Sequence, residues 1–158
     1  MSRLLSANFS RLIKSKLFWL GAGVMLVLGI YIPVTSYIQQ VKYDYTAPLD
    51  SIFFGYSIII GIVCAVFCSL FIGTEYSDGT IRNKIIIGHT RNAIYIANFL
   101  TSAFAGLIMT FIYIAAVSVL GIPFFGFFET DIKTVLLYLL ASIAMVVAFV
   151  SIYTTISM

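Results

Sequence analysis

Residues 51–73, SIFFGYSIIIGIVCAVFCSLFIG, decide the fold of this chain. The stretch has no charged side chain, and it exceeds the roughly 20 residues that a helix needs to cross about 30 Å of hydrocarbon. Three further runs have the same character, over residues 17–38, 92–122 and 134–158. We therefore predict an all-α, polytopic membrane bundle with four transmembrane helices. The third run is longer than a crossing requires, so its helix is tilted or projects beyond the bilayer.

The composition agrees with a membrane protein and excludes a water-soluble domain. Hydrophobic residues make up 61% of the 158 residues, and charged residues make up 9%. A soluble chain of this length has too much surface for its volume to hide so much apolar area. The net charge of +3 does not indicate nucleic-acid binding, because the basic residues lie beside apolar runs and form no soluble patch.

The N-terminal block, residues 1–16, is amphipathic rather than spanning. On a helix its apolar side chains fall on one face, and they are Leu5, Phe9, Leu12 and Ile13. Arg3, Arg11 and Lys14 gather on the opposite face. We predict an interfacial helix over residues 1–16 whose cations point toward anionic lipid, followed by a transmembrane domain over residues 17–158.

Lys and Arg are unevenly divided between the two sides of the predicted bundle. Seven lie in the N-terminal block and in the loop over residues 74–91, whereas Lys42 and Lys133 alone lie in the other two loops. Loops rich in Lys and Arg stay in the cytoplasm, so both termini are predicted to be cytoplasmic. An aromatic belt at the outer interface would then contain Phe124, Phe125, Phe127 and Phe128.

Small residues recur every four positions along the second run. They are Ser57, Gly61, Ala65, Ser69 and Gly73. Helices in lipid associate closely where small residues let their backbones approach, so we predict that this stripe packs on another helix. The third run has a similar face, made of Ala97, Thr101, Ala105, Ser102, Gly106 and Thr110. Chance occurrence of small residues is the alternative for both faces.

No pattern in the chain indicates an enzyme. The four runs contain no Asp, Glu, Lys, Arg or His, so they offer no carrier for ion-coupled pumping. The phosphate-binding pattern G-x-x-x-x-G-K-[ST] is missing as well. Cys64, Cys68 and His89 have no further ligands beside them in the sequence, so we assign no catalytic, cofactor-binding or metal site.

The densest polar segment is the loop over residues 74–91, TEYSDGTIRNKIIIGHTR. Asp78-Gly79 is a turn signal that ends the second membrane helix. Thr80 is suited to N-cap a new short helix, and Gly88 to end it in a left-handed conformation. Thr90 is then placed to N-cap the third membrane helix.

These signals predict a helix of about two turns that lies across the cytoplasmic face. Ile81 and Ile85 would lie on one side of it, with Arg82 exposed. A capped loop whose cations only set the membrane topology is the alternative, and the residues alone do not decide between the two.

Within this loop, Glu75-x-x-x-Gly79-Thr80-x-Arg82-Asn83 is followed by Gly88-x-x-Arg91. This pattern resembles the inner-loop signature of type 2 ABC-transporter permeases, the membrane subunits of many bacterial exporters. The N-terminal block that runs into residues 14–19 is similar to the elbow helix and first span of that family. The resemblance covers essentially the whole chain.

The resemblance implies that residues 79–88 form a coupling helix that docks on a separate, cytoplasmic ABC ATPase. It also implies that residues 5–13 lie beside this helix along the inner leaflet of a bacterial plasma membrane. The polar docking contacts we expect are Glu75, Arg82, Lys84 and Arg91, supported by Asp78, Gly79, Thr80, Asn83 and Gly88. Ile81 and Ile85 would fill a groove in the ATPase.

We therefore predict a permease subunit of an ATP-driven exporter, with ATP hydrolysis on a separate chain and a second permease copy, identical or different, as partner. Members of the family usually have six spans and this chain stops after four, so we expect it to be the N-terminal part of a longer permease. The alternative is a stand-alone four-span accessory or immunity protein without an ATPase. A small ion-coupled multidrug pump is disfavoured by the uncharged runs.

Overall fold

The structure, a computed structural model, describes residues 2–43, 49–128 and 130–158, apart from the side chains of Ser2 and Arg3. Within these residues it contains helices and no strand. The helices are α1 (Ser2–Lys14), α2 (Lys16–Tyr43), α3 (Leu49–Phe54), α4 (Ser57–Ser77), α5 (Thr80–Ile86), α6 (Arg91–Phe125) and α7 (Ile132–Ser157). In this part of the chain, four helical segments are long and apolar enough to cross a membrane, and α3 and α4 together form one of them. The predicted all-α bundle with four membrane helices is confirmed.

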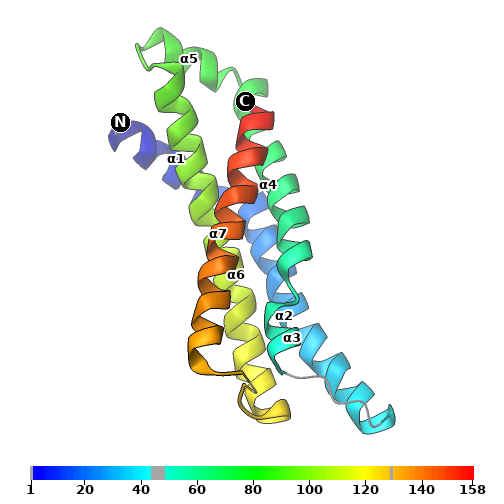
Figure 1. The fold of residues 1–158 in the computed structure, drawn as a ribbon. Helices are drawn as coiled ribbons and strands as arrows, with labels where there is room; N and C mark the ends of the chain where they lie inside the picture. The colour runs from blue at the N-terminus through cyan, green and yellow to red at the C-terminus, as the bar shows by residue number, and fades with distance from the viewer. Residues whose placement is uncertain (1, 44–48, 129) are drawn as a thin grey trace.

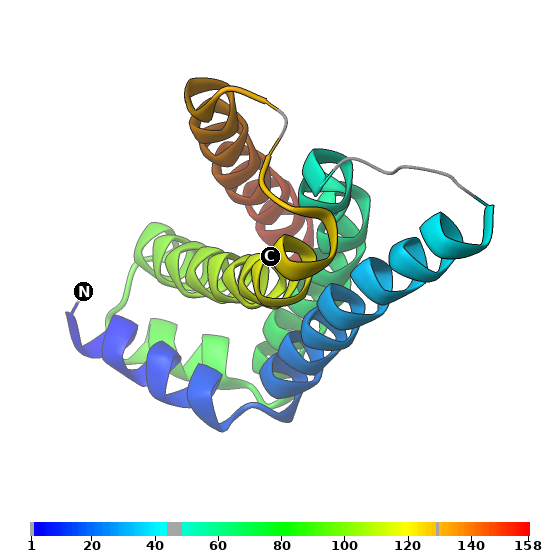
Figure 2. The ribbon, with the colours of Figure 1, turned by 90° about the horizontal axis from the view of Figure 1, so that it is seen from below.

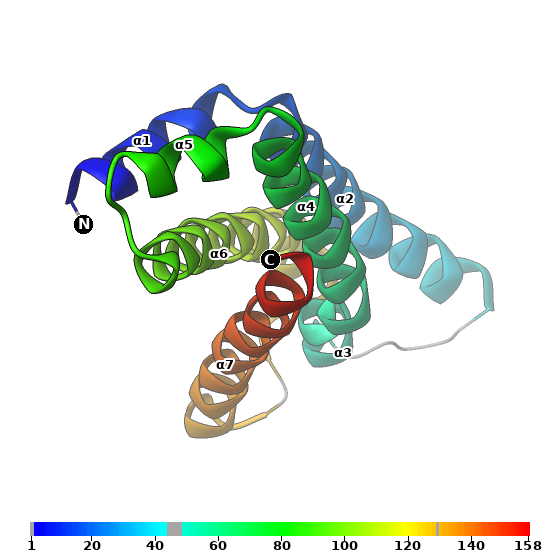
Figure 3. The same cartoon turned by 90° about the horizontal axis from the view of Figure 1, so that it is seen from above.

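Helices α1 and α5 both lie toward one end of the bundle, with α5 farther out than α1 (Figure 1), and they run alongside each other when seen from above (Figure 3). The C-terminus lies at that same end (Figure 1). We call it the α5 end. At the opposite end, the last turns of α2 and the first turns of α7 diverge (Figure 2). The predicted interfacial helix and the predicted helix of the polar loop are therefore neighbours in space, although two membrane crossings, α2 and then α3 with α4, separate them in the sequence.

Helix α6 is the central element, because it contacts every other helix. Its predicted face of small and hydroxyl residues is buried, and side chains of α4 and α7 pack on it: a Cβ atom at Gly106 would lie 3.1 Å from Val146 and 3.3 Å from Cys64. Thr101 donates its hydroxyl to the carbonyl oxygen of Ala97 over 2.8 Å, and Thr110 donates to that of Gly106 over 2.9 Å. These bonds satisfy two buried hydroxyl donors within the helix itself.

The small-residue stripe on α4 has a packed half and an open half. Gly61 is buried, and a Cβ atom there would lie 3.1 Å from the Phe149 ring of α7. Ser57 and Ala65 are half-buried, whereas Ser69 and Gly73 are exposed. The part of the stripe away from the α5 end therefore faces α7, and the part near the α5 end faces outward.

The second membrane crossing is interrupted, although a continuous helix was expected over residues 51–73. Helix α3 ends before Gly55 and α4 begins after Tyr56. The Tyr113 hydroxyl of α6 donates to the carbonyl oxygen of Ile52 over 2.9 Å. Such a partner is needed at a helix end inside a bilayer, because hydrocarbon offers none.

Helix α4 also continues past Gly73, where the sequence-based boundary lay, as far as Ser77. Glu75 therefore belongs to the last turns of this helix, and only 1% of it is exposed. Its expected position on a polar loop is wrong, and so is the expectation that this membrane helix carries no ionisable residue.

The aromatic residues of the predicted belt connect helices at the end opposite α5. The ring of Phe124 stacks on Tyr37 of α2 with 4.7 Å between centroids, and Phe128 meets Phe53 of α3 edge to face at 5.1 Å. Phe127 remains 82% exposed. Phe124 and Phe128 thus hold α2 and α3 to the end of α6, a packing role beyond the expected contact with lipid.

Candidate functional site

Helix α5 begins at the turn that the sequence predicted, but its N-cap residue lies one position earlier than expected. The Asp78-Gly79 turn ends α4 as predicted, and Gly79 has a φ of +66°, a left-handed conformation that favours glycine. Gly79 rather than Thr80 occupies the N-cap position. The Thr80 hydroxyl instead donates to the carbonyl oxygen of Glu75 over 2.9 Å, so it caps the end of α4.

The end of α5 follows the prediction closely. Gly88 has a φ of +98°, and its N–H donates to the carbonyl oxygen of Ile85 over 3.0 Å. The N–H of His89 donates to the carbonyl oxygen of Lys84 over 3.1 Å, which completes a Schellman motif. Thr90 then N-caps α6 by accepting a hydrogen bond from the N–H of Ala93 at 3.3 Å. Both ends of α5 are therefore fixed by local hydrogen bonds.

The two faces of α5 differ in what they contact. Ile81 is 9% exposed and packs against the bundle, and its predicted contact with a groove of the ATPase stays a prediction. Arg82 and Asn83 are exposed, as are Ile85, Ile86 and Ile87, with Ile86 at 71% exposure. Helix α5 thus presents one cation and an apolar patch outward, and we call residues 82, 83 and 85–87 the outer face.

A groove of about 410 Å³ lies beside this helix, at the beginning of α6. Ile81, Ile85 and Arg91 all line it. The structure therefore brings three of the predicted docking residues to one groove, although Ile81 contributes from the buried side of α5.

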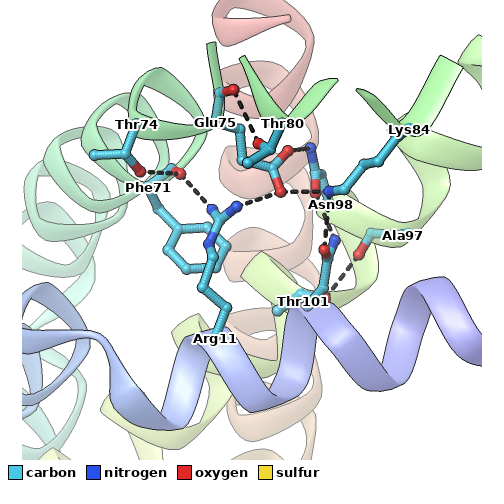
Figure 4. A network of polar contacts seen from close by, with 10 residues as sticks. Arg11, Phe71, Thr74, Glu75, Thr80, Lys84, Ala97, Asn98 and Thr101 are labelled. Carbon is cyan, nitrogen blue, oxygen red and sulfur yellow. Dashed lines mark hydrogen bonds and ion pairs between the residues drawn. The ribbon is translucent and has the colours of Figure 1, made fainter. Parts of the chain in front are cut away.

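The buried face of α5 ends in a cluster of charged and amide side chains around Glu75 (Figure 4). The cluster joins four helices: α1 through Asn8 and Arg11, α4 through Glu75, α5 through Lys84, and α6 through Asn98. We call these five residues the Glu75 cluster. Arg11 and Lys84 both pair with carboxylate atom Oε1, and the Lys84 Nζ lies 2.5 Å from it.

Four members of the Glu75 cluster form a closed ring of hydrogen bonds. The Asn98 amide donates to Glu75 Oε2 over 2.8 Å, and the Asn8 amide donates to Asn98 Oδ1 over 2.6 Å. Lys84 Nζ donates to Asn8 Oδ1 over 3.1 Å as well as to Glu75. Each carboxylate oxygen and each amide oxygen therefore has a donor, as a buried polar network requires.

Arg11 lies against both the carboxylate and the end of α4. Its guanidinium donates to the carbonyl oxygen of Phe71 over 2.5 Å and lies 3.9 Å from the centre of the Phe71 ring. Burial lowers the pKa of Arg11, and the negative charges of Glu75 and Asp78 oppose that shift. An arginine stays charged under such conditions, so the contact is an ion pair with an added cation–π interaction.

These contacts correct the predicted orientation of α1. Arg11 was expected to point toward lipid headgroups, yet it points into the bundle because a buried carboxylate lies there. The buried side of α1 consists of Leu4, Asn8 and Leu12, spaced four residues apart. Leu5 and Phe9 are half-buried and Ile13 is 62% exposed, while Arg3 lies outside the described side chains.

Asn8 and Asn98 were not predicted from the sequence as members of a site. A signal for Asn8 was present, because an amide between Leu4 and Leu12 on one helical face must find a partner when that face is buried. Asn98 is 90 residues away from Asn8, and no local pattern joins the two.

The described residues contain no group of three His, Cys, Asp or Glu side chains placed to hold a metal ion. Cys64 and Cys68 are free and buried within α4, and His89 is half-buried after α5. The polar chemistry of the described chain is therefore concentrated at the α5 end.

Comparison with known protein families identifies the family of this chain. A family model described as ABC-2 family transporter protein matches residues 4–158, a range that contains most of α1, all of α5 and the whole Glu75 cluster. No curated protein and no solved structure matched the chain. The match covers nearly the full sequence and agrees with the resemblance of the polar loop. The chain belongs to the ABC-2 transporter family and is a membrane-spanning component of an ABC transporter.

Proposed function

We propose that this chain is the permease subunit through which a separate ABC ATPase drives export, and that the ATPase binds the outer face of α5. The observation that supports this most is the contrast between the two sides of α5. One side is tied into the bundle through Ile81 and Lys84, while Arg82 and Ile86 on the other are exposed. A short helix of this kind can receive a force and pass it to the membrane helices.

The charge distribution supports a cytoplasmic position for the α5 end. Seven of the nine Lys and Arg residues lie in α1, in α5 or next to them in the sequence, which is the pattern of loops that stay inside. We place the protein in a bacterial plasma membrane with both termini in the cytoplasm. A second permease copy would complete the path for the exported molecule.

Co-expression of the chain with a neighbouring ABC ATPase gene, followed by co-purification, tests the proposal. We expect Arg82→Glu to reduce the amount of bound ATPase strongly, because it reverses the one charge on the outer face. Lys133→Glu is the matched control, since it makes the same change on an exposed residue at the opposite end of the bundle. It should leave binding unchanged.

Two results would contradict the proposal. Failure of the unmodified chain to retain any such ATPase would favour a stand-alone membrane protein. Equal retention by Arg82→Glu and the unmodified chain would remove the outer face of α5 as the binding surface.

A further inference from the structure

The Glu75 cluster connects α1 and α5, two helices that otherwise pack mainly on other helices of the bundle. Helix α1 packs on α6, and α5 packs on α4 and α6. The direct link between α1 and α5 is the hydrogen bond from Lys84 Nζ to Asn8 Oδ1 at 3.1 Å. The indirect link is the Glu75 carboxylate, whose Oε1 atom pairs with Arg11 of α1 and with Lys84 of α5.

The charges in this cluster make the carboxylate its most important member. Two cations converge on one buried acid, and the side chains of Arg11 and Lys84 are only 32% and 16% exposed. Without the carboxylate the two cations would repel each other in a region of low dielectric, where such repulsion is weakly screened. Loss of the negative charge should therefore separate α1 from α5, while Asn8 and Asn98 alone would remain as neutral contacts.

We infer that Glu75 is a positioning residue that fixes α1 to α5, so that both helices move as one body when α5 is displaced. The connection between the two helices is inferred from the observed contacts alone. Only the displacement of α5 by an ATPase depends on the proposed function. This role differs from the one predicted from the sequence, in which Glu75 was a polar docking contact. Glu75 organises the docking helix from inside and does not touch the ATPase.

Distance measurement between spin labels in lipid nanodiscs tests this connection directly. Labels at Ser10→Cys on α1 and Ile86→Cys on α5 occupy exposed positions, and the chain without introduced cysteines controls for labelling of the buried Cys64 and Cys68. We expect one narrow distance peak for the otherwise unmodified chain. Glu75→Gln, which keeps the shape and removes the charge, should lose this narrow peak.

Three further variants separate a positioning role of Glu75 from a general loss of stability. Asp78→Asn removes an exposed carboxylate one turn away and should keep the narrow peak. Arg11→Lys preserves the cation and should retain more of the narrow peak than Arg11→Met. A broad distribution in the unmodified pair, or a narrow one in Glu75→Gln, would overturn the inference.

The part that depends on the ATPase is tested on the co-purified complex. Glu75→Gln should retain the ATPase, because the outer face of α5 is unchanged. Loss of the ATPase with a preserved narrow distance peak would show that Glu75 contacts the ATPase directly. For the complex, the α5 label is moved to His89→Cys, which follows α5 and lies outside the outer face. Trapping the complex with ADP and vanadate should leave the distance between residues 10 and 89 unchanged, and a shift would overturn joint movement. If no ATPase binds the unmodified chain, the proposed function fails while the nanodisc result still tests the connection between α1 and α5.

Discussion

At the scale of single residues, Glu75 determines the chemistry of the α5 end. It is an acid with 1% exposure that accepts from Arg11, Lys84 and Asn98. Buried ion pairs add little net stability compared with apolar packing, but removal of one partner is strongly destabilising because the remaining charge stays buried. The cluster is therefore better explained by the arrangement it enforces than by the stability it adds.

Substitutions in the cluster should therefore affect stability according to the charges that they leave unpaired. Glu75→Leu should lower the free energy of unfolding by about 3 kcal/mol, because it leaves two cations without an acid. The triple change Glu75→Leu, Arg11→Met and Lys84→Met should recover most of that loss, because it leaves no unpaired charge in this region. Thermal unfolding in detergent measures both effects. If the triple variant were less stable than Glu75→Leu, the charges would not be the cause.

At the scale of elements, α5 depends on its two flanking glycines. Gly79 and Gly88 have φ values of +66° and +98°, in the region that other residues adopt with strain, although both have open space around them. The positions at which α5 begins and ends are therefore determined by the left-handed backbone of these glycines and not by tight packing around them.

Gly79→Ala and Gly88→Ala should each destabilise this region by about 1 kcal/mol. Local hydrogen exchange in α5 should become faster, while exchange in α6 and α7 should not change. Gly73→Ala is the control, because Gly73 also has open space around it but lies inside α4 with a helical backbone. That change should be neutral or slightly stabilising. Equal effects at Gly73 and Gly79 would contradict the role of the left-handed conformation.

Features of these elements that depend on neighbouring residues could be predicted from the sequence, whereas features that depend on distant residues could not. The ends of α5 were predictable, because Asp78-Gly79, Gly88 and Thr90 act on their own neighbours. The burial of Glu75 was not, since its partner Arg11 lies 64 residues earlier and a charge near a predicted helix end is ordinarily assigned to water. The interruption at Gly55 was equally hidden, because the Tyr113 hydroxyl that supports it comes from another helix.

At the scale of the whole molecule, the distribution of cations predicts the membrane orientation. Cysteines introduced at Ile86 and at Thr130 would lie at opposite ends of the bundle, and both positions are exposed. In intact cells without an outer membrane, an impermeant thiol reagent should label Thr130→Cys at once. It should reach Ile86→Cys only after the membrane is permeabilised. The reverse pattern would invert the topology and place the proposed ATPase-binding face on the wrong side.

The long sequence separation within the Glu75 cluster also has a consequence for biosynthesis. Arg11 leaves the ribosome 64 residues before the carboxylate that it pairs with, and Asn8 leaves it 90 residues before Asn98. At about 5–20 residues per second, Arg11 waits on the order of ten seconds for Glu75. The contacts of the cluster can close only after α4 and α6 have been synthesised and inserted. Helix α1 therefore reaches its native position later than these helices, although it is synthesised before them.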